Sequence, residues 1–294
     1  MQNKVPQIFD RAALARNRHH AAARLDAYDF LLRRAALDLT DRLAVQNRHF
    51  DTVLVLGASG GILRDTLNEK GLMGRQINRL IEADLTDALL PQGGLVLDEE
   101  RLPLRAGCLD AVVSFWGLHH VNDLPGAFVQ ICRALKPDGL FLAALPGNEN
   151  LRALSTAFIE SQSALDTGLR AHMHPFADLR DLAGLMQRAG FALPVADSDV
   201  VPVRYRDPMT LLRDLRGMGE SNILTTRHKA PMRRDVLHDV MTRLNMMRGA
   251  DNKFEAVFEI CYLAGFAPTQ DATRHEPGQP ITRFNETVIT EADD

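Results

Sequence analysis

A short run of β-branched residues that ends in a glycine-rich turn most constrains the fold of this chain. Thr52-Val-Leu-Val-Leu56 is followed directly by Gly57-Ala-Ser-Gly-Gly61, and a stretch compatible with a helix runs from Ile62 to Glu69. Strand, tight turn and helix in this order open a βαβ unit. Backbone N–H groups and the helix N-terminus then face the space beyond the strand, where a ligand can approach closely.

The same alternation continues through the first half of the chain. Four more strands and one helix are predicted, at Gln76–Ala83, Gly94–Leu97, Leu109–Ser114, Gly139–Leu145 and Leu124–Leu135. Strands that alternate with helices predict a parallel, doubly wound sheet. Two later segments, Phe191–Tyr205 and Phe254–Phe266, are long and alternate apolar with polar residues. That pattern is typical of antiparallel strands at a sheet edge.

Helical segments flank this sheet. Apolar residues spaced three and four apart predict two helices over Phe9–Val45, one over Asn148–Leu165 and two within Asp207–Met247. We therefore expect an N-terminal helical cover over residues 1–47 and an α/β domain over 48–267. The domain carries a helical insertion at about 206–250. The tail, 268–294, is rich in Pro, Thr and charge, so an irregular extension is predicted.

Composition excludes several kinds of partner. The chain has 294 residues, 34 Lys and Arg against 38 Asp and Glu, and a net charge of -4. No global positive field is available for nucleic acid. No apolar run approaches the roughly 20 residues of a membrane helix, so no membrane span is predicted. The three cysteines form no CxxC pair, which indicates neither disulfides nor a cysteine zinc site and favours a reducing compartment.

Acidic residues follow the second and third predicted strands. Asp84 lies 23 residues beyond Gly61, about where doubly wound nucleotide-binding folds place the acid that binds ribose, and Asp98 follows the third strand. The turn Gly57-Ala-Ser-Gly-Gly61 does not supply the GxGxxG fingerprint of nicotinamide enzymes. The alternative is a turn that merely links strand to helix.

Four successive motifs resemble those of the class I S-adenosylmethionine-dependent methyltransferases: VLVLGASGG, EADLTDALL, LDEERLPLRAGCLDAVVSFWGLHHVND and LKPDGLFLAALPG. The resemblance implies a Rossmann-like α/β fold with seven strands, the last antiparallel, and S-adenosylmethionine as cofactor. Carried over, the cofactor-binding residues are Gly57, Ser59, Gly61, Asp84 and Asp98. Ser59 departs from the family, which usually has glycine there, and its Cβ would crowd the cofactor or the backbone.

Other segments resemble one branch of that superfamily, the respiratory complex I assembly factor 5 proteins and their bacterial relatives. They are Ile8-Phe9-Asp10-Arg11, His172-Met-His-Pro-Phe176, LHHVNDLP from Leu118 and, most specifically, GMGESN from Gly217. This resemblance implies an enzyme that modifies a protein side chain, by arginine hydroxylation or methylation, in an iron–sulfur subunit of complex I. Because it begins at Ile8, a bacterial cytoplasmic protein is expected. Malonyl-carrier-protein methyltransferases form the neighbouring branch.

A few polar residues are candidates for the acceptor site. His119 ends the fourth strand and is interpreted as a base or an acceptor-orienting group, with a turn cap as the alternative. Glu220 and Asn222 are interpreted as acceptor-binding, with a helix cap as the alternative.

The spacing of His172, His174 and Asp178 would suit two imidazoles and one carboxylate on a metal. An HxH pair before a proline is more often exposed, so we predict no metal site. Two other functions stay open: a small-molecule or malonyl-carrier-protein methyltransferase, and a non-catalytic assembly chaperone.

Overall fold

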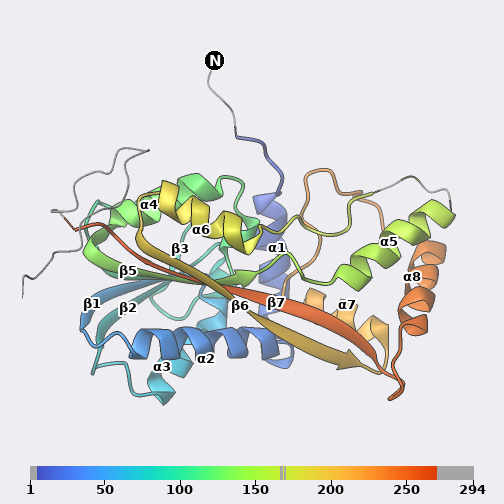
Figure 1. The fold of residues 1–294 in the computed structure, drawn as a ribbon, viewed down its shortest axis with the longest axis horizontal. Coiled ribbons are helices and arrows are strands. Elements are labelled where there is room, and N and C mark those ends of the chain that lie inside the picture. The colour runs from blue at the N-terminus through green and yellow to red at the C-terminus, as the bar shows by residue number, and fades with distance from the viewer. Residues whose placement is uncertain (1–4, 166–167, 169, 270–294) are drawn as a thin grey trace, which may run out of the picture.

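Seven strands form one mixed sheet in the computed structural model, which describes residues 5–165, 168 and 170–269 (Figure 1). They run in the spatial order β3-β2-β1-β4-β5-β7-β6. The first five strands of this order are parallel, and β7 is antiparallel to both of its neighbours. The strands are β1 (Phe50–Leu56), β2 (Ile77–Asp84), β3 (Leu95–Val96), β4 (Leu109–Phe115), β5 (Leu135–Pro146), β6 (Ala192–Tyr205) and β7 (Phe254–Phe266). The predicted Rossmann-like methyltransferase fold is confirmed.

Helices cover both faces of the sheet. Those of the described residues are α1 (Arg11–Ala22), α2 (Phe30–Ala44), α3 (Ile62–Glu69), α4 (Leu124–Ala134), α5 (Arg152–Ala164), α6 (Leu179–Arg188), α7 (Pro208–Gly217) and α8 (Arg234–Met246). In Figure 1, α2 and α3 lie below the sheet and α4 and α6 above it, while α5, α7 and α8 gather at the right. The core accordingly forms two large apolar clusters, one on each face.

Most predicted elements are present, with local differences. The helix expected over Asn148–Leu165 begins only at Arg152, because the Asn150 side chain donates hydrogen bonds to the backbone oxygens of Gly147 (2.9 Å) and Glu259 (2.6 Å) in a turn. Helix α6 was not predicted, although Asp178 caps it by accepting from the Arg180 N–H at 2.9 Å. Helices α7 and α8 occupy the segment expected as an insertion.

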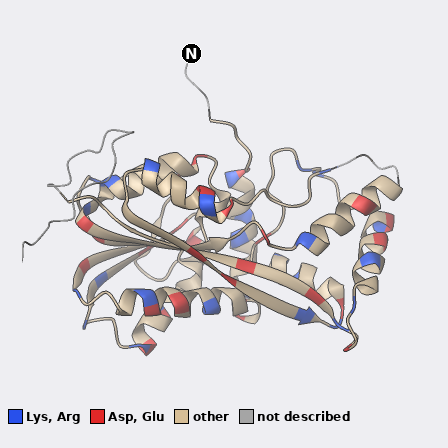
Figure 2. Cartoon of the chain, in the orientation of Figure 1, with Lys and Arg blue, Asp and Glu red and all other residues tan. Residues whose placement is uncertain are grey.

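Basic and acidic residues are interspersed along the helices and strands in the ribbon of Figure 2. This agrees with the composition, which gave no positive field for nucleic acid. No helix among the described residues is long and apolar enough to cross a membrane. Most of the tail expected to be irregular, residues 270–294, lies outside the described residues.

Candidate functional site

The glycine turn lies at the carboxyl end of β1, in the middle of the sheet. Gly57 has φ +88°, and a Cβ there would lie 2.1 Å from the Phe115 carbonyl oxygen of β4, so a side chain has no room. Gly61 has φ +87° and precedes α3. Ser59 is also left-handed, with φ +46°, a conformation that favours glycine. The departure from the family pattern therefore falls where the backbone is strained.

Asp84 ends β2 beside this turn, and its side chain is fully buried. Its carboxylate accepts from the backbone N–H groups of Ser59 and Thr86, both at 3.4 Å. Arg18 of α1 also reaches it, with Nη1 3.2 Å from Oδ1, while Arg18 Nη2 donates to the Trp116 carbonyl oxygen at 2.6 Å. The guanidinium thus bridges the ends of β2 and β4.

A second arginine of α1 pairs with the acids that follow β3. Arg11 donates to Asp98 Oδ1 at 2.7 Å and forms an ion pair with the buried Glu99. Arg11 and Arg18 lie seven residues apart, two helical turns, so they project from one face of α1. Neither arginine was predicted as a site residue from the sequence. Their spacing together with Leu14 and Ala21 was the available signal.

The chemical types of these residues are suited to binding S-adenosylmethionine. The Gly57–Gly61 turn would offer N–H groups to the methionine part, and Asp84 and Asp98 would accept hydrogen bonds from ribose hydroxyls and the adenine amine, as the sequence predicts. Asp84 would share its carboxylate between the ribose and Arg18. When bound, the cofactor supplies an activated methyl group.

Two histidines occupy the short turn after β4. Trp116, which precedes them, has φ +59°, and Gly117 leaves room for Glu99, whose Oε1 would lie 2.8 Å from a Cβ there. His119 and His120 follow in a 3-10 turn over Leu118–His120, and both are buried. A non-glycine residue held in the left-handed region at a strand end is the kind of strain that functional sites retain.

Glu220 meets both imidazoles from the opposite side. Its Oε2 lies 3.3 Å from His119 Nε2 and 3.2 Å from His120 Nε2. Gly217 packs against Tyr28, whose Cγ would lie 2.2 Å from a Cβ, and Gly219 reverses the chain with φ +85°. The GMGESN segment therefore folds so that Glu220 points inward, where its side chain is 13% exposed.

Asn222 has a different set of contacts. Its side chain donates to the Ala171 carbonyl oxygen and accepts from the Leu224 N–H, both at 2.9 Å. The bond to Ala171 links the GMGESN segment to the loop before α6, and the bond from Leu224 closes a local turn. Asn222 also lines the cavity described next, so its predicted contact with an acceptor stays a prediction.

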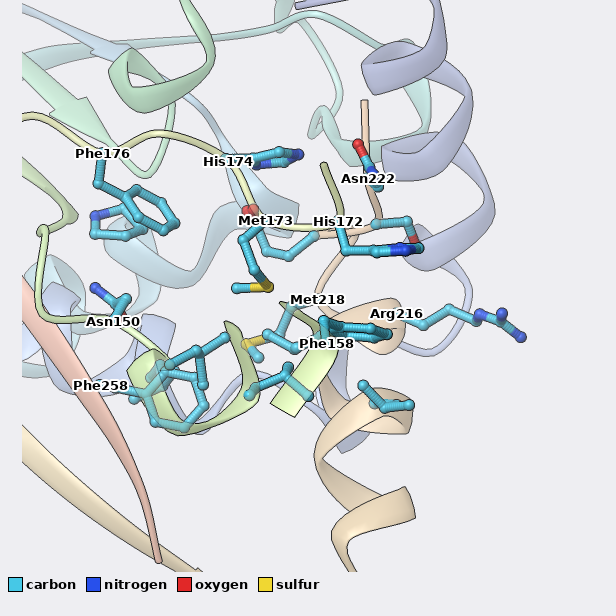
Figure 3. Close-up of a pocket in the computed structure, with 18 of the residues that line it drawn as sticks. Asn150, Phe158, His172, Met173, His174, Phe176, Arg216, Met218, Asn222 and Phe258 are labelled. Carbon is cyan, nitrogen blue, oxygen red and sulfur yellow. The ribbon is translucent and has the colours of Figure 1, made fainter. Parts of the chain in front are cut away.

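Glu220 lines an apolar cavity of about 250 Å³. Figure 3 shows this cavity with many of its lining side chains. Phe158, Met173, Met218 and Phe258 are among the side chains that form its walls, and Glu220 is the acidic residue among the described residues that line it. In Figure 3, the Arg216 side chain extends away from the apolar side chains of the cavity wall. None of the five predicted cofactor residues lines the cavity, so it is separate from the glycine turn.

His172, His174 and Asp178 do not form a group that could bind one metal ion in the structure. The His172 ring stacks on Phe158 with centroids 4.4 Å apart, and His174 Nε2 accepts from the Ile223 N–H at 3.2 Å. Asp178 caps α6. Burial lowers the pKa of His174 to about 4, so its imidazole is neutral. Among the described residues, the group able to hold a metal is His119, His120 and Glu220.

Fold and site together define an enzyme of the S-adenosylmethionine-dependent methyltransferase class. The methyltransferase domain family matches residues 54–143. The YcgJ protein of Bacillus subtilis has a similar fold, with a TM-score of 0.54, 14% identity, and coverage of 80% of this chain and 99% of that chain. A Haemonchus contortus phosphoethanolamine N-methyltransferase 2, solved with S-adenosyl-L-methionine, gives a TM-score of 0.51, 17% identity, and coverage of 84% and 57%.

Proteins with similar sequences identify the family within this class. The human mitochondrial arginine-hydroxylase NDUFAF5 is 32% identical over 291 residues, covering 95% of this chain and 83% of its own. A malonyl-[acyl-carrier protein] O-methyltransferase of Methylovorus sp. is 28% identical over 274 residues, covering 89% and 90%. The chain belongs to the arginine-hydroxylase NDUFAF5 family.

Proposed function

We propose that this enzyme hydroxylates an arginine side chain of a protein substrate, an iron–sulfur subunit of complex I, in the bacterial cytoplasm. The family relationship supports the reaction type, because the similar human protein is named an arginine-hydroxylase. All three cysteines are free, which is compatible with a reducing compartment.

One observation on the structure carries the proposal: an apolar cavity has a carboxylate that is only 13% exposed, that of Glu220, in its wall. An arginine side chain has an apolar stem and a planar cationic head that pairs well with a carboxylate. The stem would lie against Phe158, Met218 and Phe258, and the guanidinium would approach Glu220. Hydroxylation replaces a C–H bond by C–OH. With dioxygen as oxidant, the second oxygen leaves as water and a reductant supplies two electrons and two protons.

Methyl transfer is a second candidate, because the turn and Asp84 are suited to hold a methyl donor. It needs a nucleophile in line with the sulfonium carbon and the exclusion of water, and few residues beyond those. The acceptor would be the same protein side chain, a small molecule or a malonyl-carrier protein, as in the Methylovorus relative.

Mass spectrometry separates these candidates. We expect the subunit's arginine peptide to gain one oxygen in cells with this enzyme and to lack it in cells without. A gain of one methyl group would replace hydroxylation by methylation, and no change in any arginine would refute both for this substrate. Glu220→Gln should abolish the modification. The matched control is Glu160→Gln on α5, whose side chain is 50% exposed and pairs with Arg243, and it should leave the modification unchanged.

A further inference from the structure

Two adjacent imidazoles and one carboxylate converge at a single point between β4 and the GMGESN segment. The three ligand atoms all lie within 4.8 Å of one another, and the two distances from Glu220 Oε2 to the imidazoles are 3.3 and 3.2 Å. A first-row metal with bonds of about 2.1 Å holds neighbouring donor atoms about 3.0 to 3.4 Å apart. The two separations from Glu220 Oε2 match those of neighbouring ligands on one ion.

Hydrogen bonding within the group is incomplete. The side chains of His119 and His120 are 2% and 0% exposed. His120 Nε2 and the Nδ1 atoms of both rings have no hydrogen-bond partner among the described residues. Buried polar side-chain atoms nearly always have one, so the unsatisfied His120 Nε2, which lies 3.2 Å from Glu220 Oε2, needs an explanation. A cation bound by the Nε2 atoms of both rings and by Glu220 would give His120 Nε2 its partner.

We propose that His119, His120 and Glu220 bind a divalent first-row transition-metal ion, with Glu220 linking the metal site to the cavity. Imidazole nitrogens select such ions over Mg²⁺ and Ca²⁺, which prefer oxygen ligands. Two imidazoles and one carboxylate leave open positions on the metal, as in the Fe(II) sites of oxygenases. His174 is not a fourth ligand through Nε2, because that atom accepts from the Ile223 N–H.

This inference goes beyond the proposed function and does not depend on it, because metal binding is measured on the purified full chain without substrate. The sole tryptophan, Trp116, reports on the site: its ring centroid lies 6.2 Å from that of His119. We expect Co²⁺, and Fe²⁺ without oxygen, to quench Trp116 fluorescence at an equimolar end point. Mg²⁺ should have no effect. Absence of quenching and of Co²⁺ visible absorption in the parent protein would overturn the inference.

Substitutions test which side chains bind the ion. Glu220→Gln keeps the side-chain volume and should weaken Co²⁺ binding at least about tenfold, as should His119→Gln. His172→Gln is the matched control, because His172 lines the same cavity but stacks on Phe158 away from the triad, and it should bind Co²⁺ as the parent does. Circular dichroism checks that each variant is folded. If Co²⁺ binding were lost in His172→Gln and kept in Glu220→Gln, the assignment would be wrong.

Discussion

The ion pair between Arg18 and Asp84 gives a quantitative test of how α1 is held to the sheet. The two side chains are 6% and 0% exposed, with Nη1 and Oδ1 3.2 Å apart. At an effective dielectric constant of about 20, charges at this distance attract by about 5 kcal/mol. Arg18→Met keeps most of the apolar stem but leaves the buried carboxylate without its cation. We expect it to lower the free energy of unfolding by about 3 to 5 kcal/mol.

The assay is urea unfolding followed by circular dichroism, because the fluorescence of Trp116 would respond directly to the loss of the Arg18 hydrogen bond. Arg18→Met combined with Asp84→Asn should lose less stability than the sum of the single variants, since the amide that replaces the carboxylate carries no charge. As a control, Arg34→Met removes an exposed pair, with Arg34 Nε 2.5 Å from Asp199 and side chains 53% and 30% exposed. This variant should lower the free energy of unfolding by less than about 1 kcal/mol.

Two results would refute this reasoning. The first is an Arg18→Met variant that unfolds within about 1 kcal/mol of the parent, because the pair would then contribute no more than an exposed one. The second is full additivity of the two single losses in the double variant. Arg18 and Asp84 would then act independently, and the bridge from α1 to β2 would not stabilise the fold.

Three further predictions concern the cofactor turn and the GMGESN segment. Asp84→Ala should weaken S-adenosylmethionine binding by about 2 kcal/mol or more in calorimetry, because hydrogen bonds to a charged group are lost; equal affinity would reject the site assignment. Ser59→Gly should preserve or improve that affinity and change stability by less than about 1 kcal/mol, since glycine relieves the left-handed strain but gains entropy on unfolding; weaker binding would mean that the hydroxyl contacts the ligand. Gly217→Ala should destabilise the protein by about 1 to 3 kcal/mol in urea unfolding, because its Cβ meets Tyr28, and an unchanged midpoint would contradict that packing.

Local sequence patterns were sufficient to predict the seven strands, and the family resemblance implied how they form one sheet. Buried parallel strands such as β1 read as continuous apolar runs, and the glycine turn marks where β1 ends. Helix α6 was not predicted, because its ten residues form a short segment directly after a loop. The fold class is confirmed, whereas the cofactor and acceptor roles of individual residues stay predictions.

The arrangement of the candidate site could be predicted only in part. His119 and Glu220 were each singled out, but they are 101 residues apart, and no local pattern indicates that they meet. His120 was not assigned a role because adjacent side chains usually point in different directions. The arginines of α1 were missed because a charged helix face is usually exposed, and only tertiary packing shows that Arg18 is buried.

The position of β7 between β5 and β6 has a consequence for synthesis on the ribosome. Strand β6 ends at Tyr205, yet its pairing partner, β7, begins only at Phe254. Strand β6 and one edge of β5 therefore have no pairing partner until β7 has been synthesised. Strand edges that wait unpaired are sites of aggregation during folding. A chain that stops before β7 would therefore lose β6 from the sheet as well, and premature termination just before Phe254 should yield insoluble protein.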